Sequence, residues 1–280
     1  MSEAKRYEDY LSADNHAIST CLHIATVLGD LMETDLTLVG GLVPSLLIPQ
    51  DGDLPDFEMH CGTLDVDLGL SLAILDAELY ATLAEKLRSN GFSADIKDSG
   101  QTVIQRWRTP QDTAQGVTTD FLIPQSSESD KPSSIKHLEE DFGAIITPGL
   151  QLVTRDWKHV VINGCTLNGE ITARTIRVCG PGAFIVLKAR ALHNRHKEKD
   201  AYDLLYMLRY FGDGIEDIAE ALNLLMDDAD AVEAMKWLKD DFSTIDSPGP
   251  LRTARFRLGI PDDDLQADAM GLVQDLLRVL

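Results

Sequence analysis

The stretch Gly62–Leu70, GTLDVDLGL, decides the fold class of this chain. Apolar residues alternate with Asp65 and Asp67 as far as Leu72, and such alternation is typical of a β-strand with one buried face. Side chains two positions apart leave a strand on the same side, so both carboxylates point the same way. Because like charges this close repel each other, the pattern predicts a Mg²⁺ or Mn²⁺ ion between them. The alternative is two aspartates that face solvent at a strand edge.

A third carboxylate lies in another apolar extended segment, Val117–Pro124, which contains Asp120. Three carboxylates on adjacent strands are able to hold two metal ions about 3.5–4 Å apart. That arrangement activates an attacking oxygen and stabilises a leaving pyrophosphate. Asp120 is therefore the third predicted metal ligand, and its alternative is a solvated strand residue.

Two glycines, Gly40 and Gly41, follow a short apolar strand at Thr37–Val39. Glycines at such a place allow backbone N–H groups to approach a phosphate closely, and a following helix adds positive potential. A glycine pair after a strand is usually only a turn. Its position before the carboxylate strand is what makes it a candidate for phosphate binding.

The rest of the chain divides into a mixed part and a helical part. The predicted helices of the first part are Asp14–Glu33 and Ala77–Ser89, with a helical turn near Pro44, and its further strands lie near residues 102–107, 117–123, 159–163 and 171–178. From Gly180-Pro181 onward the periodicity is helical, with helices expected over 181–195, 199–211, 215–226, 230–242 and 263–280. We therefore predict an α/β (α+β) fold, with a mixed-sheet core over residues 1–180 and a helical domain over residues 181–280.

Composition limits the partners of the chain. Its 280 residues carry a formal net charge of -21, which disfavours extended contact with nucleic acid. No run of about 18 apolar residues and no signal peptide are present, so we expect a cytoplasmic protein without a membrane partner. The four cysteines are scattered, which predicts reduced core thiols: Cys21, Cys61, Cys165 and Cys179.

One segment of this acidic chain is basic. Seven basic residues and one acidic residue lie between Arg174 and Lys199. Lys188 is flanked at helical spacing by apolar residues, so it either snorkels outward or points at an anion, and Arg195 lies on the same face. Lys199 and Asp203 are placed for an i, i+4 ion pair. On this basis Lys188→Ala should weaken nucleotide binding with little loss of folding stability.

Together these motifs resemble a known family. Two glycines, a strand with two aspartates and a third strand aspartate resemble the DNA polymerase beta-type nucleotidyltransferase superfamily. The later run of Lys188, Ala191, Arg195, Lys199, Asp200 and Asp203 resembles the corresponding motif of the AbiEii/AbiGii-type nucleotidyltransferases, toxins of type IV toxin–antitoxin systems. The resemblance covers about residues 36–210, and the motifs occur in the order typical of the family.

The resemblance implies a role for each motif residue. Gly40, Gly41 and Ser45 would hold a nucleoside triphosphate, and Asp65, Asp67 and Asp120 would bind Mg²⁺ or Mn²⁺. Asp120 would also help to deprotonate the acceptor. Lys188 would contact the triphosphate with support from Arg195, and Asp200 and Asp203 match the acidic pair of the family. Implied partners are a nucleoside triphosphate, an RNA or protein acceptor and an antitoxin.

One departure from the superfamily pattern is the long gap between Gly41 and Asp65. The loop Gln50–Cys61 is either a lid or surface decoration, and its length favours decoration. Two other functions compete with a metal-dependent nucleotidyltransferase that transfers a nucleoside monophosphate to a hydroxyl of RNA, protein or a small molecule. They are a non-catalytic nucleotide- or partner-binding protein on the same fold, and a metal-dependent glycosyltransferase.

Overall fold

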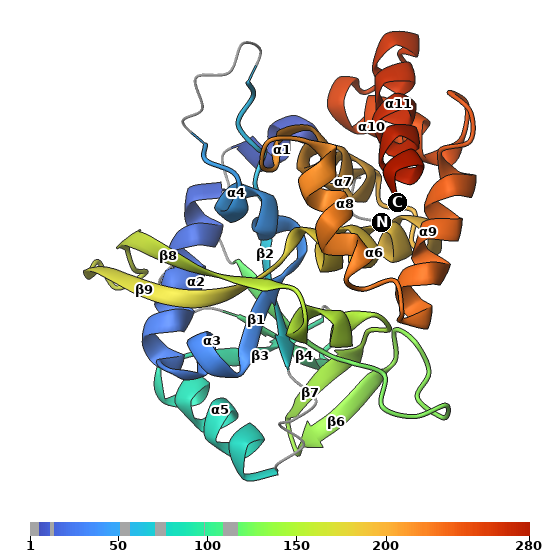
Figure 1. Cartoon of the computed structure of the whole chain (residues 1–280). Coiled ribbons are helices and arrows are strands. Elements are labelled where there is room, and N and C mark those ends of the chain that lie inside the picture. Colours follow the sequence, from blue (N-terminus) through green and yellow to red (C-terminus); the bar gives the residue numbers. More distant parts are fainter. Residues whose placement is uncertain (1–5, 12–13, 51–56, 71–76, 98, 109–116) are drawn as a thin grey trace. The chain divides into compact units, whose positions relative to one another are not determined.

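The chain folds into two compact units. The computed structural model describes residues 6–11, 14–50, 57–70, 77–97, 99–108 and 117–280 (Figure 1). The sheet unit comprises Ala13–Leu42 and Gly62–Cys179, and the helical unit comprises Met1–Ser12, Val43–Cys61 and Gly180–Leu280. The predicted mixed α/β class is confirmed. The division into functional domains at residue 180 stays a prediction.

Within the described residues, nine strands form one mixed sheet. They are β1 (Leu36–Val39), β2 (Asp65–Leu70), β3 (Ser93–Ile96), β4 (Thr102–Arg108), β5 (Thr118–Ile123), β6 (Ile135–Glu139), β7 (Phe142–Ile146), β8 (Trp157–Cys165) and β9 (Ile171–Cys179). The main order is β3-β4-β5-β2-β1-β9-β8, and β7 pairs with β5 and β6. Strand β2 is thus central, antiparallel to β1 and parallel to β5.

Helix α2 (Asp14–Leu28) packs against strands β8 and β9 and against helix α5 (Ala77–Ser89). The periodic apolar residues that predict it, among them Leu22, Ile24 and Leu28, are fully buried. The predicted single helix to Glu33 is wrong, because α2 ends before Gly29, whose φ of +61° is left-handed. A separate short helix, α3 (Leu31–Thr34), follows.

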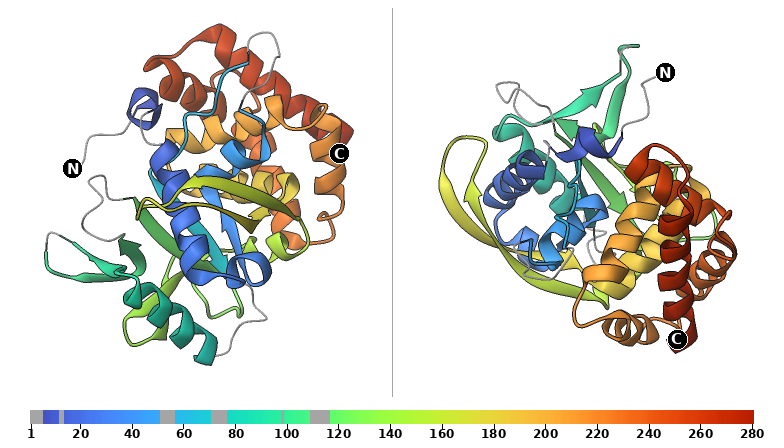
Figure 2. Two further views of the ribbon diagram at one scale, coloured as in Figure 1. Left: turned by 90° about the vertical axis from the view of Figure 1, so that its left-hand side faces the viewer. Right: turned by 90° about the horizontal axis from the view of Figure 1, so that it is seen from above.

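Strands β8 and β9 form a long antiparallel hairpin. All nine residues of β8 pair with β9, whereas only Arg177 and Val178 of β9 pair with β1. The hairpin therefore extends beyond the rest of the sheet (Figure 2). Exposed apolar residues occur along it, including Val161 and Ile171.

The helical unit contains α1 (Tyr7–Leu11), α4 (Val43–Leu47), α6 (Pro181–Asn194), α7 (Glu198–Tyr210), α8 (Ile215–Asn223), α9 (Ala229–Asp241), α10 (Pro248–Leu258) and α11 (Asp263–Val279). Helix α6 begins at Pro181, as predicted, and packs against α7, α8 and α9. Its residues Phe184, Ile185 and Leu192 are buried. Helix α6 is thus central to this unit and carries Lys188.

Several predicted features have a mixed outcome. The predicted ends of α5 are confirmed, whereas β3, β6, β7 and α10 were not predicted. Residues 71 and 72 of the predicted carboxylate strand, and residues 51–56 of the loop Gln50–Cys61, lie outside the described residues. Cys165 is exposed, contrary to the expectation of core thiols, while the other three cysteines are buried and all four are free.

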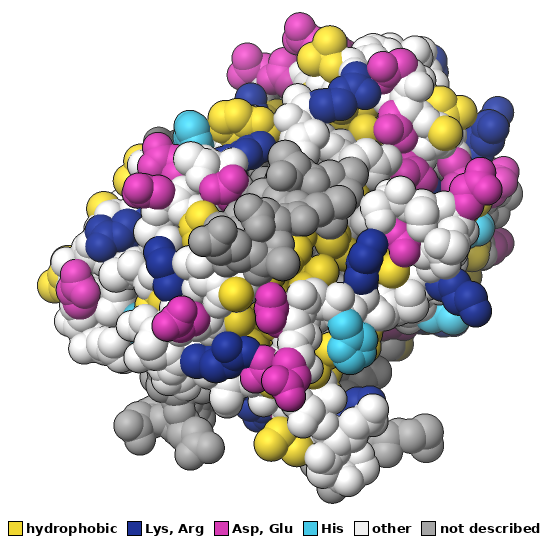
Figure 3. All heavy atoms as spheres, turned by 90° about the horizontal axis from the view of Figure 1, so that it is seen from below, with side chains coloured by type: hydrophobic (Ala, Val, Ile, Leu, Met, Phe, Trp, Pro, Cys, Tyr) yellow, Lys and Arg dark blue, Asp and Glu magenta, His cyan; other side chains and the backbone are white. Residues whose placement is uncertain are grey.

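Acidic and basic side chains mix on the surface. On the face shown in Figure 3, Lys and Arg side chains stand singly or in small groups among Asp and Glu, without a continuous basic area. Over the part of the chain that the structure describes, no helix has the length and apolar character needed to cross a membrane.

Candidate active site

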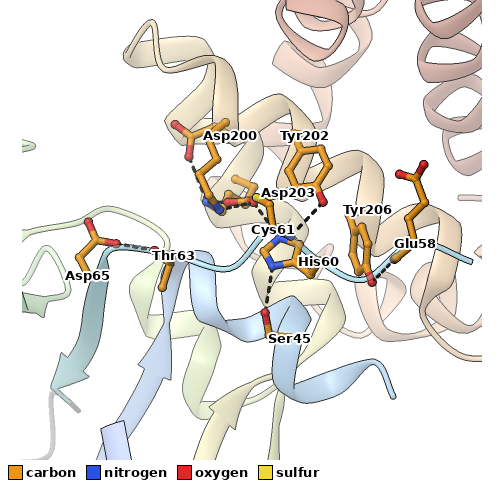
Figure 4. A network of polar contacts seen from close by, with 12 residues as sticks. Ser45, Glu58, His60, Cys61, Thr63, Asp65, Asp200, Tyr202, Asp203 and Tyr206 are labelled. Atoms are coloured by element: carbon orange, nitrogen blue, oxygen red, sulfur yellow. Dashed lines mark hydrogen bonds and ion pairs between the residues drawn. The ribbon is translucent and has the colours of Figure 1, made fainter. Parts of the chain in front are cut away.

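Two carboxylates leave one face of strand β2 in the sheet unit. Val66 and Leu68 are buried, whereas Asp65 and Asp67 are half-buried, as alternation along the strand predicts. The Thr63 hydroxyl donates a hydrogen bond of 2.7 Å to Asp65 Oδ1 (Figure 4). The carboxylate pair therefore lies on one face, and Thr63 fixes the orientation of one member.

Gly40 follows β1 at the level of Asp67. Val39 pairs with Asp67 across the two strands, and Gly40 has a φ of +77°. A Cβ atom on Gly40 would lie 1.9 Å from Asp67 Oδ2. Glycine thus permits both the left-handed backbone and the close approach of the Asp67 carboxylate. Gly41 is buried in the 3₁₀ turn Gly40–Leu42, and phosphate binding by both glycines stays a prediction.

Asp120 lies in register with Asp67 on the parallel strand β5. On its other side it pairs with Arg106 of β4, which sequence reasoning missed. Arg106 Nε donates to Asp120 Oδ1 at 2.7 Å, and Nη2 donates to Oδ2 at 2.6 Å. The bond to Asp120 raises the pKa of Arg106 further above its usual value, so the guanidinium stays charged. Asp120 is therefore already bound by a cation of the protein.

The carboxylate face suits a hard divalent ion in its chemistry. Asp65 and Asp67 supply anionic oxygens on one face, the ligand type that Mg²⁺ and Mn²⁺ prefer. No cluster of three or more His, Cys, Asp or Glu side chains placed to hold a metal occurs among the described residues. Arg106 bonds to both oxygens of Asp120, so an ion bound by all three carboxylates would share Asp120 with Arg106.

A second polar cluster lies inside the helical unit and centres on Lys188. Its side chain is 7% exposed, and Nζ donates to Asp200 Oδ1 at 3.0 Å and to Asp203 Oδ2 at 2.7 Å. Burial alone would lower the pKa of Lys188, but the charges of Asp203 and Asp200 outweigh burial and raise it. Lys188 is thus a buried, charged ammonium held by both aspartates of the predicted motif, and it does not snorkel.

Two more cations complete the cluster. Arg195 donates from Nε to Asp200 Oδ2 at 2.7 Å and from Nη2 to Oδ1 at 2.8 Å. Lys199 Nζ donates to Asp203 Oδ1 at 2.6 Å, which confirms the predicted i, i+4 pair. Three cations and two anions give this group a net positive charge. The Arg195 side chain, 52% exposed, presents that charge to solvent.

Sequence reasoning also missed His60, which lies in the segment Phe57–Cys61. Its Nε2 lies 3.0 Å from Asp203 Oδ1, and its Nδ1 lies 2.9 Å from Ser45 Oγ (Figure 4). His60 and Cys61 are buried in the helical unit, so surface decoration is the wrong interpretation of this end of the loop. The only sequence signal was a histidine among turn formers, and its partner Asp203 lies 143 positions away.

Most of the chain matches a known protein family. Residues 63–279 match the family described as nucleotidyl transferase AbiEii toxin, type IV toxin–antitoxin system. The chain belongs to the AbiEii family. The resemblance inferred from the motifs is therefore confirmed. The matched AbiEii region includes both the carboxylates of β2 and β5 and the Lys188 cluster, while Gly40, Gly41, Ser45 and His60 precede it.

Comparisons with solved structures and with curated proteins say less about this chain than the family match does. One similar structure is that of an antigenic nucleotidyltransferase-like protein from Paracoccidioides brasiliensis, with 17% identity and a TM-score of 0.42. The alignment covers 80% of this chain and 94% of that chain. No curated protein matches this AbiEii chain. Family membership itself assigns the chain to the nucleotidyltransferases of toxin–antitoxin systems.

Proposed function

We propose that this AbiEii chain is a metal-dependent nucleotidyltransferase that acts as the toxin of a type IV system. It transfers a nucleoside monophosphate from a nucleoside triphosphate to a hydroxyl of RNA, protein or a small molecule. The observation that carries this proposal is the row formed by Asp67 on β2 and Asp120 on β5, with Asp65 on the same face of β2. An antitoxin partner and a cytoplasmic location belong to the same proposal.

In the reaction, the acceptor oxygen attacks the α-phosphorus in line with the leaving group. A new P–O bond forms, the bond to pyrophosphate breaks, and the acceptor proton passes to Asp120. Asp65 and Asp67 would hold Mg²⁺ or Mn²⁺ together with Asp120, and the bound ion supplies charge neutralisation at the triphosphate. Arg106 takes one lone pair on each Asp120 oxygen, so Asp120 would join the ion through its remaining lone pairs or after one bond to Arg106 breaks.

The triphosphate needs positive charge as well as a metal. Gly40 and Gly41 offer backbone N–H groups. Ser45, the third predicted group of this set, is buried and its hydroxyl bonds to His60, which disfavours direct contact with phosphate. The Lys188 cluster is a cationic group, and Arg195 is its member that is more than half exposed. We assign the first contact with phosphate to Arg195, with Lys188 as the buried charge behind it.

A non-catalytic nucleotide-binding protein is the second candidate. The bidentate bond between Arg106 and Asp120 favours it, because that bond already neutralises the charge of a carboxylate which a transferase needs. Lys188 is similarly occupied by Asp200 and Asp203. On this alternative, nucleotide would bind without any transfer.

The deciding experiment supplies each labelled nucleoside triphosphate with Mg²⁺ or Mn²⁺, total RNA and cell protein. We expect label to appear on an acceptor with the natural chain and to disappear with Asp65→Asn or Asp67→Asn. A matched control is Asp263→Asn with Asp264→Asn, because these two exposed carboxylates lie at the start of α11. Transfer by the Asp65 or Asp67 variants would contradict the proposed site. Nucleotide binding without transfer in any mixture would support the second candidate.

A further inference from the structure

We infer that His60 is a positioning residue of the helical unit. Its neutral ring carries the proton on Nε2, holds the Asp203 carboxylate against Lys188, and accepts a hydrogen bond from the Ser45 hydroxyl on Nδ1. The consequence for nucleotide binding rests on the proposed function, whereas the protonation state of the ring does not.

The surroundings of His60 fix the orientation of its ring. The side chains of His60 and Asp203 are both fully buried. The Tyr202 ring stacks on His60 at 5.4 Å, and the Tyr206 ring meets it edge-on at 4.8 Å. Because a flipped ring would exchange nitrogen for carbon at both hydrogen-bonding positions, the two aromatic contacts and two polar contacts select one orientation.

The proton position follows from the partners of the ring. Burial lowers the pKa of His60 to about 4, although the bond to Asp203 opposes this shift, so the ring is neutral near pH 7. A neutral imidazole has one N–H group. Burial alone would raise the pKa of Asp203, but Lys188 and Lys199 bring it far below its usual value, so this carboxylate only accepts. Nε2 therefore carries the proton, and Ser45 donates to Nδ1.

The bond from His60 matters because Asp203 serves three donors. Asp203 Oδ1 accepts from His60 at 3.0 Å and from Lys199 at 2.6 Å, while Oδ2 accepts from Lys188 at 2.7 Å. Without His60, the two lysines alone would set the rotation of this carboxylate. The Lys188 ammonium, which Asp203 helps to hold, would then lose its fixed position relative to Arg195.

The order carboxylate, imidazole, hydroxyl also occurs in hydrolases that use a serine nucleophile. Here the three side chains are buried, and Ser45 is only 7% exposed. A nucleophile must meet its substrate, so this burial favours a positioning role over a hydrolytic one. A fluorophosphonate probe should accordingly leave Ser45 unlabelled, and stoichiometric labelling of Ser45 would overturn the inference.

The direct test is ¹⁵N NMR of the full chain labelled at histidine, recorded from about pH 7.5 to about pH 5. The His60 signals are identified by their absence in His60→Gln. We expect the neutral pattern with the proton on Nε2 across this range. A proton on Nδ1, or a ring that titrates near pH 6.5, would overturn the inference.

The functional test is calorimetric titration of a nonhydrolysable triphosphate with Mg²⁺. His60→Gln keeps an amide donor toward Asp203 and should bind within about twofold of the natural chain. His60→Leu removes the donor and should bind about tenfold more weakly, as expected for one lost bond to a charged group. The control is His137→Leu, since His137 is exposed on β6.

The outcomes separate this inference from the proposed function. Equal affinity of His60→Leu and the natural chain would overturn the positioning role. No binding by the natural chain itself would contradict the proposed function, while the NMR result would still decide the protonation state of His60.

Discussion

Lys188 shows how a single buried charge changes the expected behaviour of a variant. Sequence alone treats Lys188→Ala as a change with little effect on stability. In the structure its ammonium lies between two buried carboxylates, Asp200 and Asp203, each of which keeps one further cation. Removal of one partner from a buried ion cluster leaves charge without full compensation, which is strongly destabilising.

We therefore expect Lys188→Ala to lower the free energy of unfolding by about 3 kcal/mol. Urea denaturation monitored by circular dichroism measures this change. Lys236→Ala on α9 is the control, because Lys236 is exposed and should change stability by less than about 0.5 kcal/mol. Similar small effects for both variants would show that the cluster contributes no net stability.

His60 gives a prediction for the pH dependence of stability. Its folded pKa is lowered from 6.5 to about 4 by burial, against the bond to Asp203, with Lys199 and Lys188 also facing it. The unfolded chain therefore binds more protons between these pH values, and the folded state loses stability as pH falls through this window. The loss attributable to His60 is on the order of 3 kcal/mol.

Chemical denaturation at steps from about pH 7 to about pH 4 tests this prediction. His60→Gln should show a smaller decline of unfolding free energy over the same window. The difference between the two curves of unfolding free energy against pH gives the contribution of His60, because the natural chain and the variant share all other titrating groups. Parallel curves for both proteins would show that burial does not lower the pKa of His60.

At this scale the sequence identifies residues better than it identifies their partners. Alternation along β2 correctly predicted that Asp65 and Asp67 share a face, because that property is local. The pairing of Asp120 with Arg106 was not predicted, because it depends on the antiparallel register of two strands. His60 was missed for a similar reason, since its partner is fixed by tertiary packing.

At the scale of the element, strand β2 carries two aspartates where strands rarely have them. Mutual repulsion of Asp65 and Asp67 is the energetic consequence, and a divalent ion would relieve it. We expect Mg²⁺ to raise the Tm of the natural chain and to leave the double variant Asp65→Asn, Asp67→Asn unchanged. Differential scanning fluorimetry measures both. An equal shift in the two proteins would indicate nonspecific binding to the acidic surface.

The pairing of β4 with β5 gives a fourth prediction. Arg106→Gln removes the guanidinium from Asp120, whose side chain is 8% exposed. Since Arg106 itself is 40% exposed, solvent screens part of the loss, and we expect about 1 kcal/mol of destabilisation. Mg²⁺ should recover more stability in this variant than in the natural chain, because the freed carboxylate can bind the ion.

A matched control for that variant exists in the same unit. Arg88 and Asp141 form an ion pair in which both side chains are about half exposed. Arg88→Gln should therefore change stability by less than about 0.5 kcal/mol, with no effect of Mg²⁺ beyond that on the natural chain. The same response to Mg²⁺ in both variants would exclude Asp120 as the group that binds the ion.

The elements that sequence analysis missed have weak local signals. Strands β3 and β6 have four and five residues with mostly exposed or half-exposed side chains, so little apolar alternation marks them. Helix α10 begins with Pro248-Gly249-Pro250, which reads as a turn although proline is acceptable in the first turn of a helix. Long amphipathic helices such as α11 were predicted because their period is clear.

For the whole molecule, the net charge of -21 governs the encounter with an acceptor. Figure 3 shows acidic side chains among the basic ones on the face it displays. We expect an RNA acceptor to bind with a shallow dependence on salt, because few phosphates would meet cations and few counterions would be released. Affinity measured from about 50 mM to about 200 mM salt tests this. A steep dependence would require many phosphate contacts and would contradict the prediction.

For the whole molecule, the order of residues along the chain only partly predicts which unit each segment joins. The helical character after Gly180 was evident from periodicity, because each helix carries its own apolar stripe. The membership of residues 43–61 in the helical unit was not evident, since it rests on contacts such as that of His60 with Asp203, 143 positions away. Dividing the sequence into consecutive domains cannot reveal that residues 43–61 belong to the helical unit while the segments before and after them belong to the sheet unit.

The assembly of the helical unit from three separate runs of chain has a practical consequence for dissecting this protein. A gene fragment for residues 181–280 would encode six helices without the segments that contribute Tyr7 and His60. Tyr202, which packs against both of those rings, would then be presented to water, and Asp203 would lose a donor. Such a fragment should be prone to aggregation when produced alone. Co-expression with peptides spanning residues 1–12 and 43–61 is the more promising route to a soluble helical unit.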